Sequence, residues 1–341
     1  MKSKVIIIAE AGVNHNGDFE IAKKLIAAAA EAGADYVKFQ TFKAENLVTK
    51  SARKAEYQEK NVNDGDQSQY KMLKQLEIPH EWYFQLAQYA NERGIKFLST
   101  GFDEDSINFL DDLGIDLFKV PSGEITNKPY LKLIAKKGKP VILSTGMATL
   151  KEVSEAIDVL VLNGIPKSNL TVLHCNTEYP TPMEDVNLKA MLQIRDHLGV
   201  GVGYSDHTLG IQIPVAAVAL GAVVVEKHFT IDKGMKGPDH VASLDPEELK
   251  QMVHSIRNIE LAISGNGIKE PSPSELKNIA VVRKSLYFRK DFLAGHQLQE
   301  EDFISLRPGS GISPMRIDEL VGNILNQNVE AFSIVQYDHF T

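Results

Sequence analysis

Two histidines in the second half of the chain stand where ligands of a metal ion would be expected. His207 follows the strand-like run VGVGYSD, and His228 lies 21 positions later, at the end of the apolar run AVVVEKHF. The small residues between them, IPVAAVALG, favour a helix packed on a sheet. Two parallel strands would bring both imidazoles to one edge, where neutral nitrogen ligands suit a divalent cation. The alternative is two hydrogen-bonded histidines that hold no ion.

Two lysines lie inside otherwise apolar runs, Lys38 in DYVKFQ and Lys119 in LFKV. A buried ammonium group is costly unless an anion meets it. Hydroxyl donors follow other predicted strands at Ser122, Ser144 and Ser205. Together with the lysines they would form a pocket for phosphate and carboxylate groups. Each lysine could instead pair with a buried carboxylate such as Glu10 or Glu124.

Three carboxylates at strand ends are available near these residues: Glu10, Glu124 and Asp206. Any of them could complete the coordination shell of a bound cation or transfer protons during a reaction. Their spacing in the sequence does not show which carboxylate binds the cation and which moves protons. For each of them, a structural salt bridge is an equal alternative. A cation beside an anion pocket could polarise a carbonyl and orient a water, which is Lewis-acid catalysis.

These residues are positioned by a regular alternation of β-rich runs and amphipathic helical patterns, which is typical of a parallel sheet. We predict eight strands, at residues 5–10, 35–40, 96–100, 117–120, 140–145, 170–175, 200–206 and 223–228. Eight such units predict a (β/α)8 TIM barrel, whose active face lies at the carboxyl ends of the strands. An open doubly wound sheet is the alternative, but AEAGVNHNG does not match the Gly-rich dinucleotide fingerprint.

The connection between the second and third predicted strands, residues 41–78, is unusually long and densely charged. Such a loop is either a lid or binding loop, or an inert surface excursion. Further along, we predict a catalytic barrel over residues 1–265, a Gly-, Pro- and Ser-rich linker over 266–280, and a small, mostly β domain over 281–341.

Composition excludes several classes of protein. A net charge of −8 and an isoelectric point near 5.7 give no basic surface for nucleic acid, although local lysines could still hold an anionic substrate. Cys175 is the single cysteine, so an internal disulfide framework is excluded. The apolar runs are shorter than a membrane span or a signal peptide requires. We therefore expect a soluble protein of the cytoplasm.

A series of motifs carries a resemblance to a known family. The strings IAEAGVNHNG, YVKFQTFKAENLV, KVPSGEITNKPYL, ILSTGM, HCNTEYPTP, GYSDHTLG, EKHFTIDK, GPDHVAS, KSLYF and LRPGSGISP occur in order over nearly the whole chain. They closely resemble the bacterial sialic acid synthase family, which includes the legionaminate and pseudaminate synthases. The resemblance implies a TIM barrel followed by an antifreeze-like (SAF) domain, assembled as a domain-swapped homodimer.

The resemblance also implies a role for each candidate residue. Phosphoenolpyruvate would be bound by Lys38, Thr100, Lys119, Ser122, Ser144 and Ser205. The metal, expected to be Mn2+ with Mg2+ or Co2+ as alternatives, would be held by His207 and His228. The sugar would be contacted by Gln40, Tyr179, Asp239 and, from the other subunit, Arg307. Glu124 and Glu10 would be the catalytic carboxylates.

Members of this family condense phosphoenolpyruvate with an N-acetylated amino-sugar aldehyde and release phosphate. We therefore expect a transferase, an N-acetylneuraminate synthase that uses N-acetylmannosamine. An N,N'-diacetyllegionaminate synthase that uses 2,4-diacetamido-2,4,6-trideoxymannose is the alternative. A metal-dependent pyruvate aldolase and a non-catalytic sugar-binding protein are alternatives of other classes.

Overall fold

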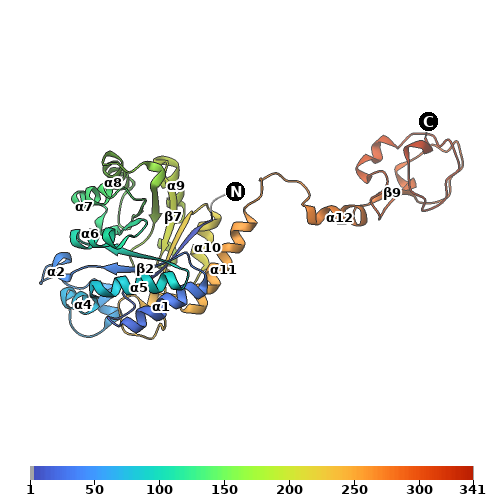
Figure 1. The fold of residues 1–341 in the computed structure, drawn as a ribbon. Coiled ribbons are helices and arrows are strands. Elements are labelled where there is room, and N and C mark those ends of the chain that lie inside the picture. The colour runs from blue at the N-terminus through green and yellow to red at the C-terminus, as the bar shows by residue number, and fades with distance from the viewer. Residues whose placement is uncertain (1–3, 341) are drawn as a thin grey trace. The chain divides into compact units, whose positions relative to one another are not determined.

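The computed structural model describes residues 4–340, which divide between Gly265 and Asn266 into two compact units. The first unit contains eight parallel strands, coloured from blue to yellow in Figure 1. Their bounds are β1 Ile6–Gly12, β2 Tyr36–Thr41, β3 Lys96–Gly101, β4 Phe118–Val120, β5 Val141–Ser144, β6 Leu170–His174, β7 Gly201–Asp206 and β8 Val224–His228. The order is β3-β2-β1-β8-β7-β6-β5-β4, in which the first strand pairs with the last.

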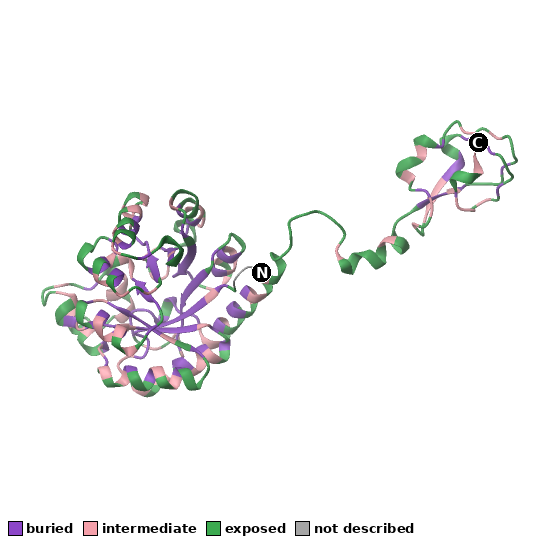
Figure 2. Cartoon of the chain, turned by 45° about the horizontal axis from the view of Figure 1, so that its top comes forward, coloured by how far each residue is buried: buried purple, intermediate pink, exposed green. Residues whose placement is uncertain are grey.

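Each strand is followed by at least one helix, as a barrel requires. The helices that alternate with the strands are α1 Phe19–Ala32, α5 His80–Glu92, α6 Glu104–Leu113, α7 Lys128–Lys136, α8 Leu150–Leu162, α9 Lys189–Leu198, α10 Gln212–Ala219 and α11 Pro246–Ala262. In Figure 2 the strands are buried, whereas the helices expose their outer faces. The predicted fold is confirmed, and most predicted strand ends agree within one residue of the observed ones.

Local chemistry explains where individual helices begin and end. At the start of α1, the Asp18 side chain accepts a hydrogen bond from the backbone N–H of Ile21, which satisfies one of the free donors of the first turn. Gly33 ends the helix at φ 82°, in the left-handed region that glycine adopts without strain. These two residues fix the length of the α1 helix, whose buried face packs on the barrel.

The register of the strands decides which side chains lie next to each other. Glu10 on β1 pairs with Lys38 on one side and with His228 on the other. Ser205 on β7 pairs with Glu226 on β8, and the next pair along is Asp206 with Lys227. Because side chains alternate along a strand, Ser205 and Glu226 share the inner face, and Asp206 and Lys227 share the outer one.

The long connection after β2 folds into three short helices. They are α2 Ala44–Leu47, α3 Glu56–Val62 and α4 Gln69–Leu76. A hydrophobic cluster of its own, built on Phe42, Met72 and Leu76 together with Val13, attaches this segment to the loop after β1. We call residues 42–79 the insertion; its structure is regular, and it has a core.

The second unit is small and contains a two-stranded antiparallel sheet, β9 Ser285–Phe288 and β10 Phe303–Leu306. Its core is built on Leu286, Phe288 and Phe303. The segment expected to be a linker contains a helix, α12 Pro273–Val282, because Ser272 and Glu275 form a capping box at its start. The β-rich run VEAFSIV, residues 329–335, makes isolated bridges at Val329 and Ile334 and forms no named strand.

Within residues 4–340, none of the helices combines the length and the apolar composition needed to cross a membrane.

Candidate active site

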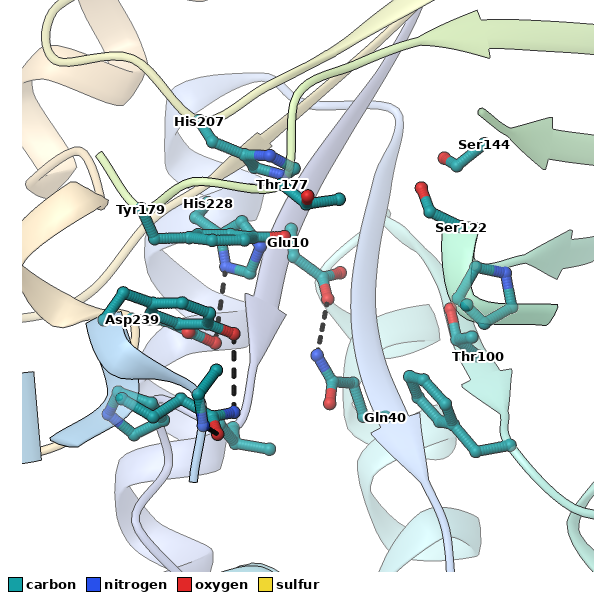
Figure 3. A pocket seen from close by; sticks show the side chains of 18 of the residues that line it. Glu10, Gln40, Thr100, Ser122, Ser144, Thr177, Tyr179, His207, His228 and Asp239 are labelled. Atoms are coloured by element: carbon teal, nitrogen blue, oxygen red, sulfur yellow. Dashed lines mark hydrogen bonds and ion pairs between the residues drawn. The ribbon is translucent and has the colours of Figure 1, made fainter. Parts of the chain in front are cut away.

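A cavity of about 600 Å³ lies at the carboxyl ends of the barrel strands. Every predicted site residue except Asp206 and Arg307 lines it. In Figure 3, His207, His228, Tyr179 and Asp239 lie on one side, and Thr100, Ser122 and Ser144 lie on the other, with Glu10 and Gln40 between them. The side chains come from all eight strands or from the loops that follow them, which is how barrel enzymes assemble their sites.

The two histidine rings lie close together, with their centroids 5.5 Å apart. The Nδ1 atom of His207 donates to the backbone carbonyl oxygen of Asn176, which leaves the Nε2 lone pair free. Burial lowers the pKa of His207 to about 4, and it lowers the pKa of His228 well below 6.5. Both imidazoles are therefore neutral at physiological pH, the form that binds metal ions.

The donor set around the histidines fits a divalent cation. The Nδ1 atom of His228 is buried and has no hydrogen-bond partner among residues 4–340, and Oδ2 of Asp239 is 3.9 Å away. A buried polar atom without a partner is costly, and a cation would satisfy it. Within the part of the chain that the structure describes, no cluster of three or more His, Cys, Asp or Glu residues is arranged to hold an ion. Two imidazoles would leave the remaining positions to water or substrate.

Two lysines and two carboxylates form a buried cluster, which we call the floor: Lys38, Lys119, Glu10 and Glu226. The Nζ atom of Lys38 lies 2.7 Å from Oε2 of Glu10 and 3.6 Å from Oε2 of Glu226. The Nζ atom of Lys119 lies 3.3 Å from Oε1 of Glu226. Lys38 therefore has the carboxylate partner that the sequence suggested as an alternative to substrate, whereas Lys119 pairs with Glu226 and not with Glu124.

The two carboxylates of the floor have opposite pKa shifts. Burial raises the pKa of Glu10 to about 7, against the opposing effect of Lys38. Burial also acts to raise the pKa of Glu226, but Lys119 and Lys38 outweigh it and lower this pKa to about 2. When Glu10 is protonated, two ammonium groups face one carboxylate charge. The floor can then accept an anionic substrate without an excess of negative charge.

Hydroxyl groups surround the floor. Thr100 Oγ1 accepts a hydrogen bond from Lys38 at 3.1 Å, and Ser205 Oγ donates to Glu226 at 3.1 Å. Ser122 Oγ accepts from the backbone N–H of Gly146 at 2.9 Å. Ser144 Oγ is buried without a partner, so it is free to meet a ligand. These hydroxyls suit the oxygens of a phosphate or carboxylate group.

Gly146 allows the loops after β4, β5 and β6 to meet at this place. A Cβ atom on Gly146 would overlap the methyl group of Thr177 and would lie 2.9 Å from Ser122 Oγ. Both neighbours line the cavity. A glycine is needed here for the close approach of the chain and not for a positive φ angle.

The side of the cavity opposite the serines is aromatic and acidic. The ring of Tyr179 stacks on His207 with the centroids 4.0 Å apart. Burial raises the pKa of Asp239 to about 7. Between the two sides, the Nε2 atom of Gln40 lies 3.5 Å from Oε1 of Glu10. Next to Ser122, Glu124 accepts a hydrogen bond from Asn127 at 2.6 Å. Together these groups offer donors and acceptors of the kind that a sugar requires.

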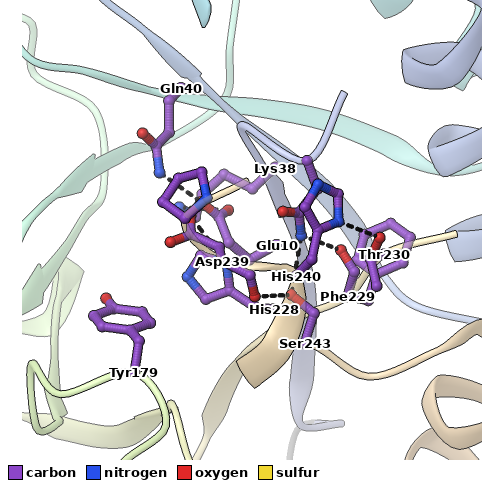
Figure 4. Close-up of polar contacts among 12 residues, drawn as sticks. Glu10, Lys38, Gln40, Tyr179, His228, Phe229, Thr230, Asp239, His240 and Ser243 are labelled. Carbon is purple, nitrogen blue, oxygen red and sulfur yellow. Dashed lines mark hydrogen bonds and ion pairs between the residues drawn. The ribbon is translucent and has the colours of Figure 1, made fainter. Parts of the chain in front are cut away.

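A buried network holds the loop that carries Asp239. The Nδ2 atom of Asn14 donates to the carbonyl oxygen of Phe229 at 2.8 Å and to Ser243 Oγ at 2.9 Å. Ser243 Oγ in turn donates to the backbone oxygen of Asp239 at 2.7 Å, and His240 Nδ1 lies 2.7 Å from Thr230 Oγ1 (Figure 4). The loop after β1 thereby fixes the loop after β8.

Asp206 does not belong to the cavity, although its place at a strand end made it a candidate carboxylate. Its side chain lies on the outer face of β7, where Oδ2 is 2.5 Å from the Nζ atom of Lys227. Neither side chain is exposed to solvent. Asp206 points away from the cavity because side chains alternate along a strand, and its neighbours Ser205 and His207 point into the cavity. The pair fixes the register of the two strands that carry the histidines.

Sequence reasoning assigned no role to several residues here, among them Glu226 and Tyr57, which line the cavity, and Asn61 beside it. Glu226 lies two positions before His228, so strand alternation alone puts both on one face. Tyr57 and Asn61 come from the insertion. The ring of Tyr57 stacks on Tyr179 at 5.0 Å, and Asn61 Nδ2 donates to the carbonyl oxygen of Pro238 at 2.7 Å. The insertion therefore lines the cavity, which favours the interpretation as a binding loop over that as an inert excursion.

Arg307 lies in the second unit, where its Nε atom donates to the carbonyl oxygen of Val282 at 2.9 Å. The side chain is exposed. Its predicted contact with a sugar in another subunit stays a prediction.

Comparison with known proteins identifies the family. The profile of the NeuB family matches residues 25–269, and that of the SAF domain matches residues 283–341. The N,N'-diacetyllegionaminic acid synthases of Campylobacter jejuni and Legionella pneumophila are 53% and 52% identical; the matches cover 98% of this chain and 99% and 94% of those proteins. The solved structure of an N-acetylneuraminic acid (sialic acid) synthetase from Leptospira borgpetersenii is 33% identical, with a TM-score of 0.70 over 81% of this chain and 90% of that one. These matches confirm the predicted resemblance and the predicted class of enzyme. The chain belongs to the NeuB family and carries a SAF domain after its barrel.

Proposed function

We propose that this protein is an N,N'-diacetyllegionaminate synthase. It condenses phosphoenolpyruvate with 2,4-diacetamido-2,4,6-trideoxymannose and water, and it releases phosphate. The observation that carries the proposal is one cavity that contains both the cationic floor and the two neutral histidines. A phosphoenolpyruvate-dependent condensation needs these two parts together, one for the anion and one to activate the aldehyde.

The choice of sugar is supported by the relatives. The sequence favoured N-acetylmannosamine as substrate and kept the diacetamido sugar as the alternative. Two relatives more than half identical over nearly the whole chain are named as N,N'-diacetyllegionaminic acid synthases, which favours that alternative. N-acetylneuraminate synthase is the second candidate, because the Leptospira protein named for that activity shares the fold at 33% identity.

In this proposal the floor binds phosphoenolpyruvate. Lys38 and Lys119 face its phosphate and carboxylate groups, and the surrounding hydroxyls donate further hydrogen bonds: Thr100, Ser122, Ser144 and Ser205. Glu10 is protonated when the substrate binds, because its pKa of about 7 leaves that form accessible and an added anion raises the pKa further. Binding thereby fixes the enolpyruvate carbon that will form the new bond.

The histidine side of the cavity binds the aldehyde. A divalent cation, for which Mn2+ is our proposal, would be held by His207 and His228 and would supply Lewis-acid polarisation of the aldehyde oxygen. Gln40, Tyr179 and Asp239 orient the sugar, and Asp239 can hold a proton because its pKa is raised to about 7. The aromatic ring of Tyr179 on His207 excludes water from one face of that imidazole.

In the proposed reaction a carbon–carbon bond forms first, and the carbon–oxygen bond to phosphate breaks last. The double-bond electrons of the enolpyruvate form a bond from C3 to the aldehyde carbon, and the aldehyde oxygen takes the proton held by Glu10 or by Asp239. Water adds to the cationic C2 and loses a proton to Glu124. The tetrahedral carbon then expels phosphate by breaking its carbon–oxygen bond. In oxygen-18 water the label should enter the acid product; label found only in the phosphate would contradict this route.

A substrate panel tests the proposed function. The full-length protein is assayed with phosphoenolpyruvate, Mn2+ and one aldehyde at a time: the diacetamido sugar, N-acetylmannosamine or N-acetylmannosamine 6-phosphate. We expect phosphate release and a nine-carbon acid with the diacetamido sugar at the highest kcat/KM. Preference for N-acetylmannosamine would favour the second candidate. Free pyruvate as the donor, without phosphate release, would indicate an aldolase, and absence of turnover would indicate a binding protein.

The proposal includes a domain-swapped homodimer that acts in the cytoplasm, with Arg307 of one subunit at the sugar site of the other. Sedimentation should then give twice the mass of one chain. Arg307→Ala should raise the KM of the sugar without changing the KM of phosphoenolpyruvate. A monomer with full activity would contradict the swapped arrangement.

A further inference from the structure

The charged residues of the cavity are unevenly distributed. Among the described residues 4–340, the lysines that line it are Lys38 and Lys119, which belong to the floor and are already paired with carboxylates, and none of the described lining residues is an arginine. Outside the floor, the charged side chains that line the cavity are all acidic: Glu56, Glu124, Glu178 and Asp239. A second anionic group on the sugar would therefore meet no free cation from the barrel unit and several carboxylates.

The insertion contributes an apolar surface to the same cavity. We call it the apolar wall, and its side chains are Leu47, Val48, Met72, Leu73 and Leu76. Met72 and Leu76 also belong to the insertion's own hydrophobic cluster, so their backbone is supported from behind. Leu47, Val48 and Leu73 are partly exposed, and Leu47 and Leu73 also pack against that cluster. Apolar side chains around an open cavity favour an apolar ligand group.

The apolar wall is held in place over the site. Asn61 bonds to the carbonyl oxygen of Pro238, the residue before Asp239, and also lies 3.3 Å from that of Tyr179. Tyr57 stacks on Tyr179. These contacts connect the insertion to both loops that are expected to bind the sugar. The position of the wall relative to the histidines is therefore set before any ligand binds.

We propose that the apolar wall is the subsite for the end of the sugar remote from the aldehyde, and that it selects a 6-deoxy methyl group over a hydroxymethyl or phosphorylated end. The inference rests on the proposed function, which places the aldehyde at the histidines and the enolpyruvate at the floor. The remaining end of the sugar must then occupy the part of the cavity that the insertion lines. A methyl group fits there, whereas a hydroxyl loses hydrogen bonds to water and a phosphate meets carboxylates.

The test compares sugars that differ only at C6. One pair is 2,4-diacetamido-2,4,6-trideoxymannose with its 6-hydroxy analogue, and the other is 2-acetamido-2,6-dideoxymannose with N-acetylmannosamine. We expect the deoxy member to have the higher kcat/KM in both pairs, by about 10- to 100-fold, the range that one such group provides in an apolar pocket. The 6-phosphate should be the poorest substrate.

Variants assign the preference to the wall. Leu73→Gln should reduce the deoxy preference to less than about threefold and leave the KM of phosphoenolpyruvate unchanged, because a polar side chain removes the apolar contact. Leu73→Met is the matched control and should keep the wild-type ratio, since it conserves volume and polarity. Val48→Thr is a second variant, which changes polarity at nearly unchanged shape. It should also lower the preference for the deoxy sugar.

The outcomes separate the two proposals. If neither diacetamido sugar is used, the proposed function fails, and the second pair of sugars still measures the preference at C6. Equal kcat/KM within both pairs would overturn the inference. So would a preference that Leu73→Gln and Val48→Thr both leave at the wild-type ratio while their melting temperatures stay normal.

Discussion

The floor and the apolar wall line one cavity but are built in opposite ways. The floor consists of charged side chains on four barrel strands, β1, β2, β4 and β8, and the register of the first two and the last puts Glu10 beside Lys38 and beside His228. The wall consists of apolar side chains on short helices between two strands, held by a few contacts through Tyr57 and Asn61. The difference suggests that the floor carries the chemistry and the wall carries the choice of sugar.

The strongest test of this division is loss of the histidines next to the floor. His207→Ala or His228→Ala should lower kcat by at least about 10³-fold, since Lewis-acid activation of the aldehyde would be lost. Both variants should also bind less Mn2+ after dialysis. His197→Ala is the control, because this histidine is exposed on α9. Normal activity with normal metal content in both variants would disprove the metal assignment.

Two lysine substitutions distinguish a residue that binds substrate from a residue that only stabilises the fold. Lys227→Met breaks the fully buried pair with Asp206 and should destabilise the fold by about 3–5 kcal/mol, measured by urea unfolding. Lys119→Met breaks a pair inside the cavity and should additionally raise the KM of phosphoenolpyruvate by at least about tenfold, because a charged hydrogen bond to the substrate is lost. If Lys227→Met gave the same rise in this KM, the two pairs would not differ in function.

The pH dependence of stability probes the loops that support Asp239. Burial lowers the pKa of His15 and of His240 to about 4, from 6.5. Between these pKa values each histidine binds fewer protons in the folded protein than in the unfolded one. The contribution of the two histidines to the free energy of unfolding is therefore fully present above pH 6.5, and it is lost as the pH falls towards 4. For His15 the loss is at most about 3 kcal/mol. His15→Asn should flatten the dependence measured by urea unfolding in apo protein; an unchanged slope would exclude this origin.

The smallest expected effect concerns the attachment of the insertion. Tyr57→Ala removes the stack on Tyr179, which is worth about 0.5–1.5 kcal/mol, so the KM of the sugar should rise a few-fold. The KM of phosphoenolpyruvate should change less, because the floor does not depend on the insertion. Tyr57→Phe keeps the ring and should behave as wild type. Equal increases in both KM values after Tyr57→Ala would remove the distinction between floor and wall.

The barrel and the floor could be predicted from the sequence because they follow from the shortest regularities of a chain. Alternation of strand and helix predicted the fold, and polar residues at strand ends predicted the lining of the cavity. Successive residues of a strand face opposite sides. Applied to β7 and β8, this alternation would have removed Asp206 from the predicted cavity lining and added Glu226 to it.

The rest of the site could not be predicted in this way. Tyr57 and Asn61 lie on a helix whose position depends on contacts with distant loops, at Tyr179 and Pro238, and no local pattern encodes such contacts. The opposite pKa shifts of Glu10 and Glu226 likewise depend on how two lysines are shared between them. Sequence spacing gives neither the distances nor the burial that determine these values.

Gly146 limits how this site can change by mutation. Because a Cβ atom there would overlap Thr177 and crowd Ser122, a substitution at position 146 is tolerated only together with a second change that makes room. The three positions form an epistatic unit within the cavity. In a library randomised at all three, active clones that lack glycine at position 146 should be enriched in alanine or serine at position 177, whereas clones that keep the glycine should vary more freely there.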